Sequence, residues 1–407
     1  MSMKLICAEC GGEHPVDEMI YRCERCDYPL EVRYDYDALI DAIDPKALRE
    51  RGWDIWRCRE LLPIKKSDFI VSLREGGTPL IRAPNLGEAL GLREVYVKDE
   101  TRNPTWSFKD RGSSVGVSKA LEIGARAVGC ASSGNMAASL ASYAARAGIK
   151  SIVLIPRKTP MGKIAQMLVC GAEVASLEAP YPEIHRAFLR SSIDFGVYMV
   201  HNDAPMRVEG QKTVSFEIAE QLEFDAPDWL LVPTSSAGNF SAVWKGWAEL
   251  NLVGLIDAAP KMGLVQAMGN APIVTSFRKG LDYVQPNSNP DTVASAITNP
   301  DPPSGKRALR IIRESDGSAE MASDRDILEA QRLLARTEGI FAEPAAAVPI
   351  ACAKKMADSG VIETDERVVL IITGAGIKDA DSALTTCTKP AELSSLDNVR
   401  DFLKGTI

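Results

Sequence analysis

A ten-residue stretch in the first third of the chain holds a lysine whose surroundings could make it reactive. The stretch reads Asn103-Pro104-Thr105-Trp106-Ser107-Phe108-Lys109-Asp110-Arg111-Gly112. Pro104 restricts Asn103 to extended backbone, which predicts a turn, and the small and apolar residues after Gly112 predict a helix through Ala120. A lysine in a crowded, partly apolar pocket can lose its proton and form a Schiff base with a carbonyl compound. The stretch alone leaves open a surface lysine at a charged helix start.

Four of the nine cysteines form a second group that could do chemistry, at the start of the chain. They are two Cys-x2-Cys pairs with twelve residues between the pairs, namely Cys7, Cys10, Cys23 and Cys26. Two such pairs supply the four thiolates of a tetrahedral structural zinc site, and a closed site of this kind leaves no position for a substrate. The alternative is a ribbon that has lost its metal and keeps reduced thiols. We expect His14 at the surface rather than among the ligands.

Three polar turns that contain glycine follow predicted strands, where open α/β sheets bind their ligands. Ser132–Asn135 (SSGN) could bind an anion or a polar ring, or could simply cap the next helix. Thr234–Asn239 (TSSAGN) is the best phosphate cradle of the chain, with small residues, hydroxyls and then a helix. Thr373–Asp379 (TGAGIKD) offers a hydroxyl to a ring nitrogen. For each turn the alternative is a structural strand-to-helix connection.

Strands and helices alternate around these turns. The predicted strands lie at 95–98, 127–131, 151–155, 172–176, 197–200, 229–232, 263–267 and 367–373. The predicted helices lie at 134–147, 159–170, 181–192, 210–221, 242–251, 324–337 and 344–358. This alternation predicts parallel sheets covered on both faces, so we expect two open α/β units that face each other. The irregular segment 282–306 is a candidate lid or wall of a site.

The composition is that of an ordinary globular protein. The chain has 407 residues, of which 45% are hydrophobic and 25% are charged, so it is long enough for two domains. A net charge of -8 gives no general basic footprint for nucleic acid. We find neither a transmembrane run nor a signal peptide, which favours the cytoplasm. Nine cysteines in a chain of this length do not indicate a disulfide framework.

The lysine, the phosphate cradle and the two other polar turns together fit one cofactor. Pyridoxal phosphate needs an amine for its aldehyde, a helix N-terminus for its phosphate, and partners for its ring hydroxyl and ring nitrogen. No GxGxxG run follows a predicted strand, and no group of histidines and carboxylates indicates a different kind of active site. The sequence therefore favours a pyridoxal-phosphate enzyme.

These motifs resemble those of the threonine synthases, which are fold type II pyridoxal-phosphate enzymes related to the β-subunit of tryptophan synthase. The resemblance covers nearly the whole chain, from the four-cysteine ribbon to Asp379. It rests on the lysine stretch 103–112 and on Ser132–Asn135, Glu209–Thr213, Ala237–Asn239, Phe341–Ala345 and Thr373–Asp379.

The resemblance implies a role for each motif. Lys109 would bind the cofactor's aldehyde and move protons, Asn135 would meet the ring hydroxyl, and Thr373 would face the ring nitrogen. The residues that would hold the cofactor's phosphate are Ser235, Ser236, Ala237, Gly238 and Asn239. The residues that would contact the substrate are Ser132, Ser133, Asn202, Arg207 and Lys212. Among them, the guanidinium fork of Arg207 suits a phosphate dianion.

The implied reaction converts O-phospho-L-homoserine and water to L-threonine and phosphate. One alternative is a related enzyme acting on another amino acid or its phosphate, such as a cysteate synthase-like enzyme or a serine/threonine dehydratase. Another is a degenerate domain that only binds, which intact Lys109, Asn135 and Thr373 disfavour. The chain differs from the family pattern mainly on the substrate side, at Trp106, Met136, His201, Ser235, Ser236 and Ala375.

The expected fold is two open, twisted, parallel-sheet α/β domains of the fold type II class behind a small zinc ribbon. The ribbon would take residues 1–34 and a connecting segment residues 35–70. The large cofactor-binding domain would take 71–114 and 206–390, the small domain 115–205, and a tail 391–407. The resemblance also implies a homodimer that binds a small amino-acid phosphate and neither nucleic acid nor membrane.

Overall fold

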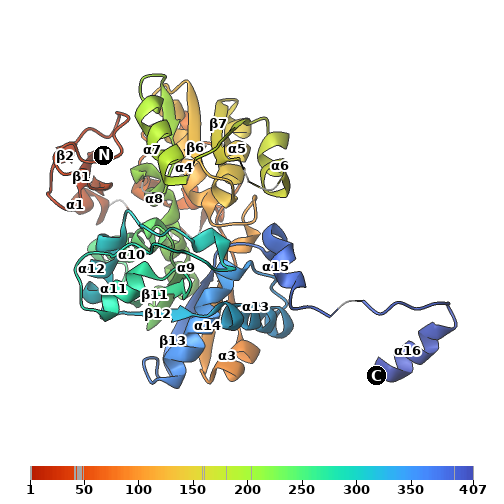
Figure 1. Ribbon diagram of the computed structural model, residues 1–407. Coiled ribbons are helices and arrows are strands. Elements are labelled where there is room, and N and C mark those ends of the chain that lie inside the picture. The colour runs from red at the N-terminus through yellow and green to blue at the C-terminus, as the bar shows by residue number, and fades with distance from the viewer. Residues whose placement is uncertain are drawn as a thin grey trace.

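The part of the chain that the structure describes forms three β-sheets, of three, four and six strands (Figure 1). In this computed structural model the described residues are 2–40, 43, 48, 50–157, 159, 161–179, 181–202, 204–388 and 390–406. Within these ranges, no helix is long and apolar enough to cross a membrane.

The N-terminal sheet is a small antiparallel ribbon with the strand order β2-β1-β3. Its strands are β1 (Met3–Cys7), β2 (Glu13–His14) and β3 (Leu30–Tyr34). His14 is buried in β2, so its expected surface position was wrong. The chain then runs through the short helices α1 (Tyr36–Ile40), η1 (Ile55–Leu61) and η2 (Ser67–Phe69).

The four-stranded sheet is entirely parallel, in the order β8-β7-β6-β9. Its strands are β6 (Ala127–Ala131), β7 (Lys150–Pro156), β8 (Glu173–Leu177) and β9 (Val197–Met199). The helices of this part of the chain are α4 (Lys109–Glu122), α5 (Asn135–Ala147), α6 (Met161–Val169) and α7 (Tyr181–Ser192). Helices α5 and α7 both pack on β6 and β7, as the alternating strands and helices predicted.

The six-stranded sheet has the order β12-β11-β10-β13-β5-β4 and is parallel except for its edge strand β4. Its strands are β4 (Leu80–Arg82), β5 (Glu94–Asp99), β10 (Trp229–Pro233), β11 (Lys261–Ala267), β12 (Ser318–Ala322) and β13 (Arg367–Ile372). Its helices are α3 (Pro84–Leu90), α8 (Pro205–Gln211), α9 (Thr213–Gln221), α10 (Gly238–Leu252), α11 (Pro272–Arg278), α12 (Gly305–Glu314), α13 (Asp324–Glu338) and α14 (Pro344–Asp358).

This large sheet is buried on both faces. Along β13, Val369 and Ile371 join one apolar cluster, while Val368, Leu370 and Ile372 join the other. Successive side chains of a strand point to opposite faces, so the near-continuous apolar run of β13 reflects burial on both sides. The predicted pair of parallel sheets is therefore confirmed.

Three predicted helices begin at least four residues away from where the structure places them, and each lies next to the cavity described below. Helix α4 begins at Lys109 itself rather than after Gly112. The helix predicted over 210–221 is two helices, α8 and α9, which meet at Lys212. Helix α10 begins at Gly238, directly after Ala237, which adopts the left-handed backbone conformation (φ 65°).

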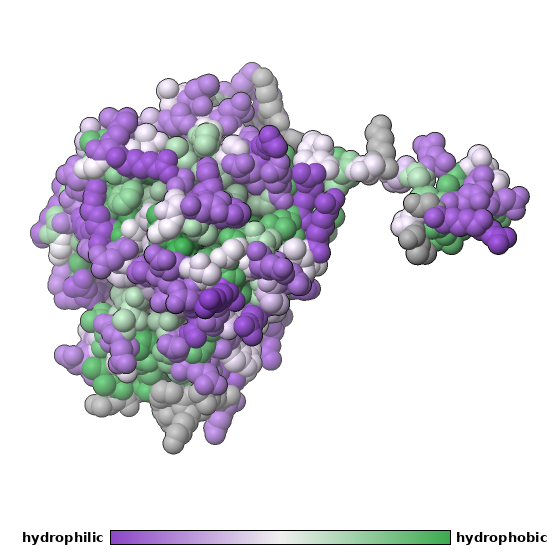
Figure 2. Space-filling model, turned by 90° about the horizontal axis from the view of Figure 1, so that it is seen from below, coloured by the Kyte–Doolittle hydropathy of each residue, from purple (hydrophilic) through white to green (hydrophobic). Residues whose placement is uncertain are grey.

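The C-terminal segment leaves the body of the molecule as an arm. Helix α15 (Ala380–Leu384) ends near the body, and α16 (Asn398–Thr406) stands apart from it (Figure 1). Figure 2 shows this arm projecting from the main body, with apolar residues on part of its surface. Leu396 and Phe402 are among its exposed apolar side chains.

Candidate active site

A cavity of about 690 Å³ opens where the parallel strands end. The turns after β6, β10 and β13 all contribute to its wall, as expected for ligand sites at the carboxyl ends of strands. Within the predicted lid segment, residues 295–300 also line it. The cavity brings together most of the residues singled out from the sequence: Lys109, Ser132, Ser133, Asn135, Asn202, Arg207, Ser235, Ser236, Ala237, Gly238, Asn239 and Thr373.

The turn before Lys109 is held by side-chain hydrogen bonds to buried groups. The carboxylate of Asp110 accepts from the backbone N–H of Thr105 (2.6 Å), from the Thr105 hydroxyl (2.5 Å) and from the Ser139 hydroxyl (2.6 Å). Burial raises the pKa of Asp110 to about 6, although these hydrogen bonds lower it. Asn103 donates to the carboxylate of Glu100 (2.9 Å), which fixes the other end of the turn. Lys109 therefore starts its helix from a rigid loop.

The lysine turn lies against the end of β13. The backbone N–H of Phe108 donates to the carbonyl of Thr373 (3.0 Å), and that of Ala375 donates to the carbonyl of Trp106 (3.0 Å). These two bonds place Lys109 beside the Thr373 turn. Trp106 adopts a positive φ of 64°, which is rare for a bulky residue, and its half-exposed ring forms part of the cavity wall.

The environment of Lys109 favours a neutral amine. Burial and, after it, the positive charge of Arg207 lower the pKa of Lys109 well below its ordinary value, while the Glu343 carboxylate opposes the shift. Its Nζ also lies 3.9 Å from the centroid of the Phe108 ring. A neutral lysine amine is a nucleophile for an aldehyde and a base for a carbon acid.

Glu343 is a site residue that the motif analysis did not assign a role. It lines the cavity at the start of α14, and its two carboxylate oxygens accept from the Asn135 amide, each at 3.1 Å. Burial raises the pKa of Glu343, although Asn135 and the charge of Lys109 lower it. Its position, immediately before Pro344 at a helix start, was the available signal in the sequence. A buried carboxylate thus orients Asn135 within the cavity.

The predicted phosphate cradle forms the N-terminus of the fifteen-residue helix α10. The Ser236 hydroxyl accepts hydrogen bonds from the side-chain amides of Asn202 (2.9 Å) and Asn299 (2.7 Å). Gly238 is required here because a Cβ at this position would lie 2.4 Å from the carbonyl oxygen of Asn202. Free backbone N–H groups at a helix N-terminus attract an anion, so this end of the cavity suits a phosphate group.

Helix α8 presents a second group of polar side chains to the cavity. Arg207 and Gln211 are four residues apart, both are buried, and both line the cavity. Residues at this spacing lie on one face of a helix. Neither side-chain atom of the Gln211 amide has a hydrogen-bond partner among the described residues, so this amide is available to a ligand. The sequence analysis did not single out Gln211, although it lies within the quoted motif Glu209–Thr213.

Lys212 lies apart from the other predicted substrate residues. It does not line the cavity, and its ammonium is buried between the carboxylates of Glu209 and Glu249, 2.6 Å from the latter. Lys212 follows Gln211 at the end of α8, about 100° further around the helix, which turns its side chain away from the cavity. Its role as a substrate contact finds no support in this geometry.

The cavity fits pyridoxal phosphate. It offers an amine whose pKa is lowered by burial, a helix N-terminus closed by a glycine that no larger residue could replace, an amide at Asn135 and a hydroxyl at Thr373. These are the donor types that the cofactor's aldehyde, phosphate, ring hydroxyl and ring nitrogen require. Arg207 and Gln211 lie on a different helix from the α10 cradle, so the cavity can receive a second anionic group.

The four N-terminal cysteines converge as the sequence predicted. Their sulfur atoms all lie within 4.8 Å of one another, with 3.4 Å between Cys7 and Cys26 and 3.6 Å between Cys10 and Cys23. A tetrahedron with Zn–S bonds of about 2.3 Å has edges of about 3.8 Å, so the four thiols are placed to hold one metal ion. Backbone N–H groups of Glu9 and Cys10 point at the Cys7 sulfur (3.4 and 3.5 Å).

Comparison with known proteins gives concordant results. Residues 71–374 match the family described as pyridoxal-phosphate dependent enzyme. The chain is 46% identical to a threonine synthase of Methanocaldococcus jannaschii over 97% of both chains, and 43% identical to one of Methanosarcina acetivorans over 98% of both. A solved structure of threonine deaminase isoform 2 from Solanum lycopersicum shares the fold, with a TM-score of 0.64 at 23% identity over 76% of this chain and 88% of that one.

Proposed function

We infer that this chain, which belongs to the pyridoxal-phosphate dependent enzyme family, is a threonine synthase that converts O-phospho-L-homoserine and water to L-threonine and phosphate. Curated relatives of this name align with the chain over almost its full length. The observation that carries the inference is the second anion site of the cavity. Arg207 and Gln211 face the same space as Lys109 and the α10 cradle. One anion site would take the cofactor's phosphate and the other the substrate's.

When bound, pyridoxal phosphate would stabilise negative charge on the substrate carbon next to the amine. Lys109, Asn135, Thr373 and the turn 235–239 would hold it. The Nζ of Lys109, kept neutral by burial, would remove the proton from the substrate's Cα and then a proton from Cβ.

The substrate would be oriented by groups at its two ends. Ser132 and Ser133, at the start of α5, would bind its carboxylate with hydroxyl and backbone donors. Arg207 and Gln211 would bind the γ-phosphate, and the fork of Arg207 would stabilise the charge that develops as the phosphate leaves. Water would then add its hydroxyl at Cβ and give its proton to the phosphate, and the two protons removed by Lys109 would return to Cγ and to Cα. Holding both ends would fix which protons Lys109 can reach.

A related enzyme acting on a different amino acid is the competing function. Dehydratases of unphosphorylated hydroxy amino acids need no second anion site, so the buried Arg207 favours a phosphorylated substrate. O-phosphoserine, which is one carbon shorter, is the phosphorylated competitor. Its phosphate would have to reach Arg207 from a carbon that lies one bond nearer to the amine.

The deciding experiment incubates the cofactor-loaded enzyme with O-phosphohomoserine, O-phosphoserine or unphosphorylated homoserine, and measures phosphate release from the first two and the amino-acid product of all three. We expect turnover of the first only, with L-threonine as the product. No turnover of O-phosphohomoserine would reject the proposed activity. In a second experiment, Lys109→Ala should abolish the visible absorption of the lysine-bound cofactor. Wild-type protein that stays colourless after reconstitution would reject the cofactor.

We also propose that the four-cysteine cluster holds a structural zinc ion and that the enzyme is a cytoplasmic homodimer. The sulfur geometry supports the metal. The oligomeric state is a prediction from the family resemblance, and the compartment is the one predicted above from the sequence. Light scattering of the purified enzyme at about twice the mass of the 44.1 kDa chain would support the dimer.

A further inference from the structure

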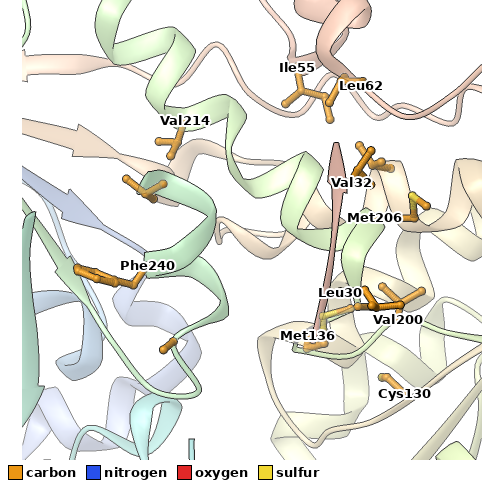
Figure 3. Packing of buried hydrophobic residues seen from close by; sticks show 14 of the residues in the cluster. Leu30, Val32, Ile55, Leu62, Cys130, Met136, Val200, Met206, Val214 and Phe240 are labelled. Atoms are coloured by element: carbon orange, nitrogen blue, oxygen red, sulfur yellow. The ribbon is translucent and has the colours of Figure 1, made fainter. Parts of the chain in front are cut away.

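The wall of the cavity that carries Arg207 and Gln211 lies against the N-terminal ribbon. Among the described residues, no cavity-lining side chain comes from the ribbon itself. Figure 3 shows Leu30 of β3 beside Val200 and Met136, and Val32 of β3 near Met206. Val200 and Met136 line the cavity, and Met206 immediately precedes Arg207. The apolar face of β3 therefore packs directly behind the wall that carries the phosphate-binding side chains.

Tyr34, at the end of β3, connects the ribbon to helix α8. Its buried hydroxyl donates to the carboxylate of Glu209 at 2.7 Å, and Glu209 lies two residues after Arg207 on the same short helix. The ammonium groups of Lys212 and Lys245 lie 4.4 and 5.2 Å from the centroid of the Tyr34 ring. Lys245 also pairs with Glu209 at 3.1 Å. Glu209 is thus fixed from both sides, by the ribbon and by the two lysines.

Tyr21 makes a second connection, from the ribbon to the strand β9. Its hydroxyl accepts a hydrogen bond from the backbone N–H of Met199 (2.7 Å), a group on the edge strand of the four-stranded sheet. Its ring meets the ring of His201 edge-on, with 5.1 Å between the centroids. His201 and the next residue, Asn202, line the cavity. Tyr21 therefore supports the wall at Asn202, and Tyr34 supports it at Arg207.

The ribbon can act as a support because it is itself fixed to the body. Its apolar residues belong to the same core cluster as the four-stranded sheet. Arg310 of α12 pairs with Glu9 at 3.0 Å, and Arg307 of the same helix pairs with Glu31. The cysteine cluster holds the loop that connects two of these contact residues. Cys23 lies two residues after Tyr21, and Cys26 lies four residues before Leu30.

We propose that Tyr34 is a positioning residue for the substrate's phosphate, acting through Glu209 on helix α8, and that the ribbon as a whole sets the affinity of the phosphate site. The proposal rests on the proposed function. Tyr34 does not line the cavity, so the loss of its hydroxyl leaves the chemistry at Lys109 intact. It leaves Glu209 with one partner fewer, and α8 then shifts toward Lys245 on α10. A shift of this kind moves the guanidinium of Arg207 away from the position in which it can bind a phosphate group.

The test compares Tyr34→Phe with Tyr36→Phe in the full-length, cofactor-loaded enzyme. Tyr36 is a matched control because its hydroxyl donates to Glu249 (2.9 Å). Glu249 shares the ion pairs of Glu209 with the two lysines, but it lies on α10 rather than on α8. The measurements are the dissociation constant of inorganic phosphate by calorimetry, KM and kcat for O-phosphohomoserine, and the visible spectrum. One lost buried hydrogen bond should raise the phosphate dissociation constant and KM about three- to tenfold in Tyr34→Phe.

In that variant kcat and the spectrum should stay unchanged, and Tyr36→Phe should change neither constant by more than about twofold. Equal effects in the two variants, or normal phosphate binding by Tyr34→Phe, would overturn the proposal. If Tyr34→Phe does not fold, Tyr21→Phe tests the same support from the other side and should weaken phosphate binding in the same way. A wild-type enzyme that binds no phosphate would overturn the proposed function as well. Normal wild-type binding with an unaffected Tyr34→Phe would overturn the positioning role alone.

Discussion

The backbones of Gly112 and Gly210 touch where helices α4 and α8 cross. A Cβ on Gly210 would lie 2.0 Å from the carbonyl oxygen of Arg111 and 2.9 Å from the Cα of Gly112. A Cβ on Gly112 would lie 2.4 Å from the Cγ of Arg207. Helix α4 begins with Lys109 and α8 carries Arg207, so this contact between glycines sets how close the Lys109 amine and the Arg207 guanidinium can be.

Gly210→Ala should therefore damage both stability and substrate binding. The added methyl group must push the two helices apart, which should lower the free energy of unfolding by about 1–3 kcal/mol. It should also raise KM for the phosphorylated substrate, because Arg207 moves with α8. Gly52→Ala is the control, since the nearest atom to its new Cβ is 3.9 Å away, on the Arg74 side chain. Denaturant unfolding measures the stability. A Gly210→Ala variant that is as stable as the wild type would contradict the packing argument.

The pH dependence of cofactor uptake should report the charges around Lys109. The rate at which the cofactor-free protein binds pyridoxal phosphate should rise as Lys109 loses its proton. Burial and the cation of Arg207 hold the pKa of Lys109 well below its ordinary value. The rise should therefore be complete at a pH well below the pKa of a free lysine. Stopped-flow absorbance over a range of pH values measures this profile.

Two variants should move the profile in opposite directions. Arg207→Gln removes a cation that disfavours the ammonium form, so the pKa of Lys109 rises and the profile shifts to higher pH. Glu343→Gln removes an anion that favours the ammonium form, so the pKa falls and the profile shifts to lower pH. Shifts of the same sign in both variants would mean that neither charge acts on Lys109 as described.

Gln211→Leu should separate stability from binding. The amide of Gln211 is buried with no partner among the described residues, and burying such a group costs about 1–3 kcal/mol, so its removal should leave the unliganded protein equally stable or more stable. The same change should weaken inorganic phosphate binding about three- to tenfold, because one donor to the anion is lost. Gln211→Glu, which places a negative charge there, should weaken it further. Unchanged phosphate affinity in both variants would remove Gln211 from the site.

Metal analysis should find about one zinc ion per chain, because four thiolates complete one tetrahedral shell. Replacing Cys7 and Cys23 together by serine should abolish zinc binding and lower the thermal stability. Cys387→Ser is the control, because Cys387 is exposed and lies outside the cluster. Retention of zinc by the double variant would place the metal elsewhere.

Local signals in the sequence determined much of this protein. The spacing of Cys7, Cys10, Cys23 and Cys26 was enough to predict their convergence, because each Cys-x2-Cys pair lies on one tight turn. Apolar runs predicted the parallel strands except β12 (Ser318–Ala322), since strands buried on both faces need apolar residues throughout. Polar turns after those strands predicted the cavity, because parallel strands all end on one side of a sheet.

Tertiary structure alone decided which side chains of these motifs face the cavity. The motif Glu209–Thr213 does not by itself indicate which of its side chains points into the cavity. In the structure α8 ends at Gln211, which faces the cavity, whereas Lys212 pairs with buried carboxylates. Glu343 and Asn135 are separated by 208 residues and meet only in the tertiary structure, where the residue before α14 lies against the first residue of α5. The ribbon's support of the phosphate wall through Tyr34 arises in the same way. Such contacts depend on how helices cross and rotate, and local sequence patterns do not fix those angles.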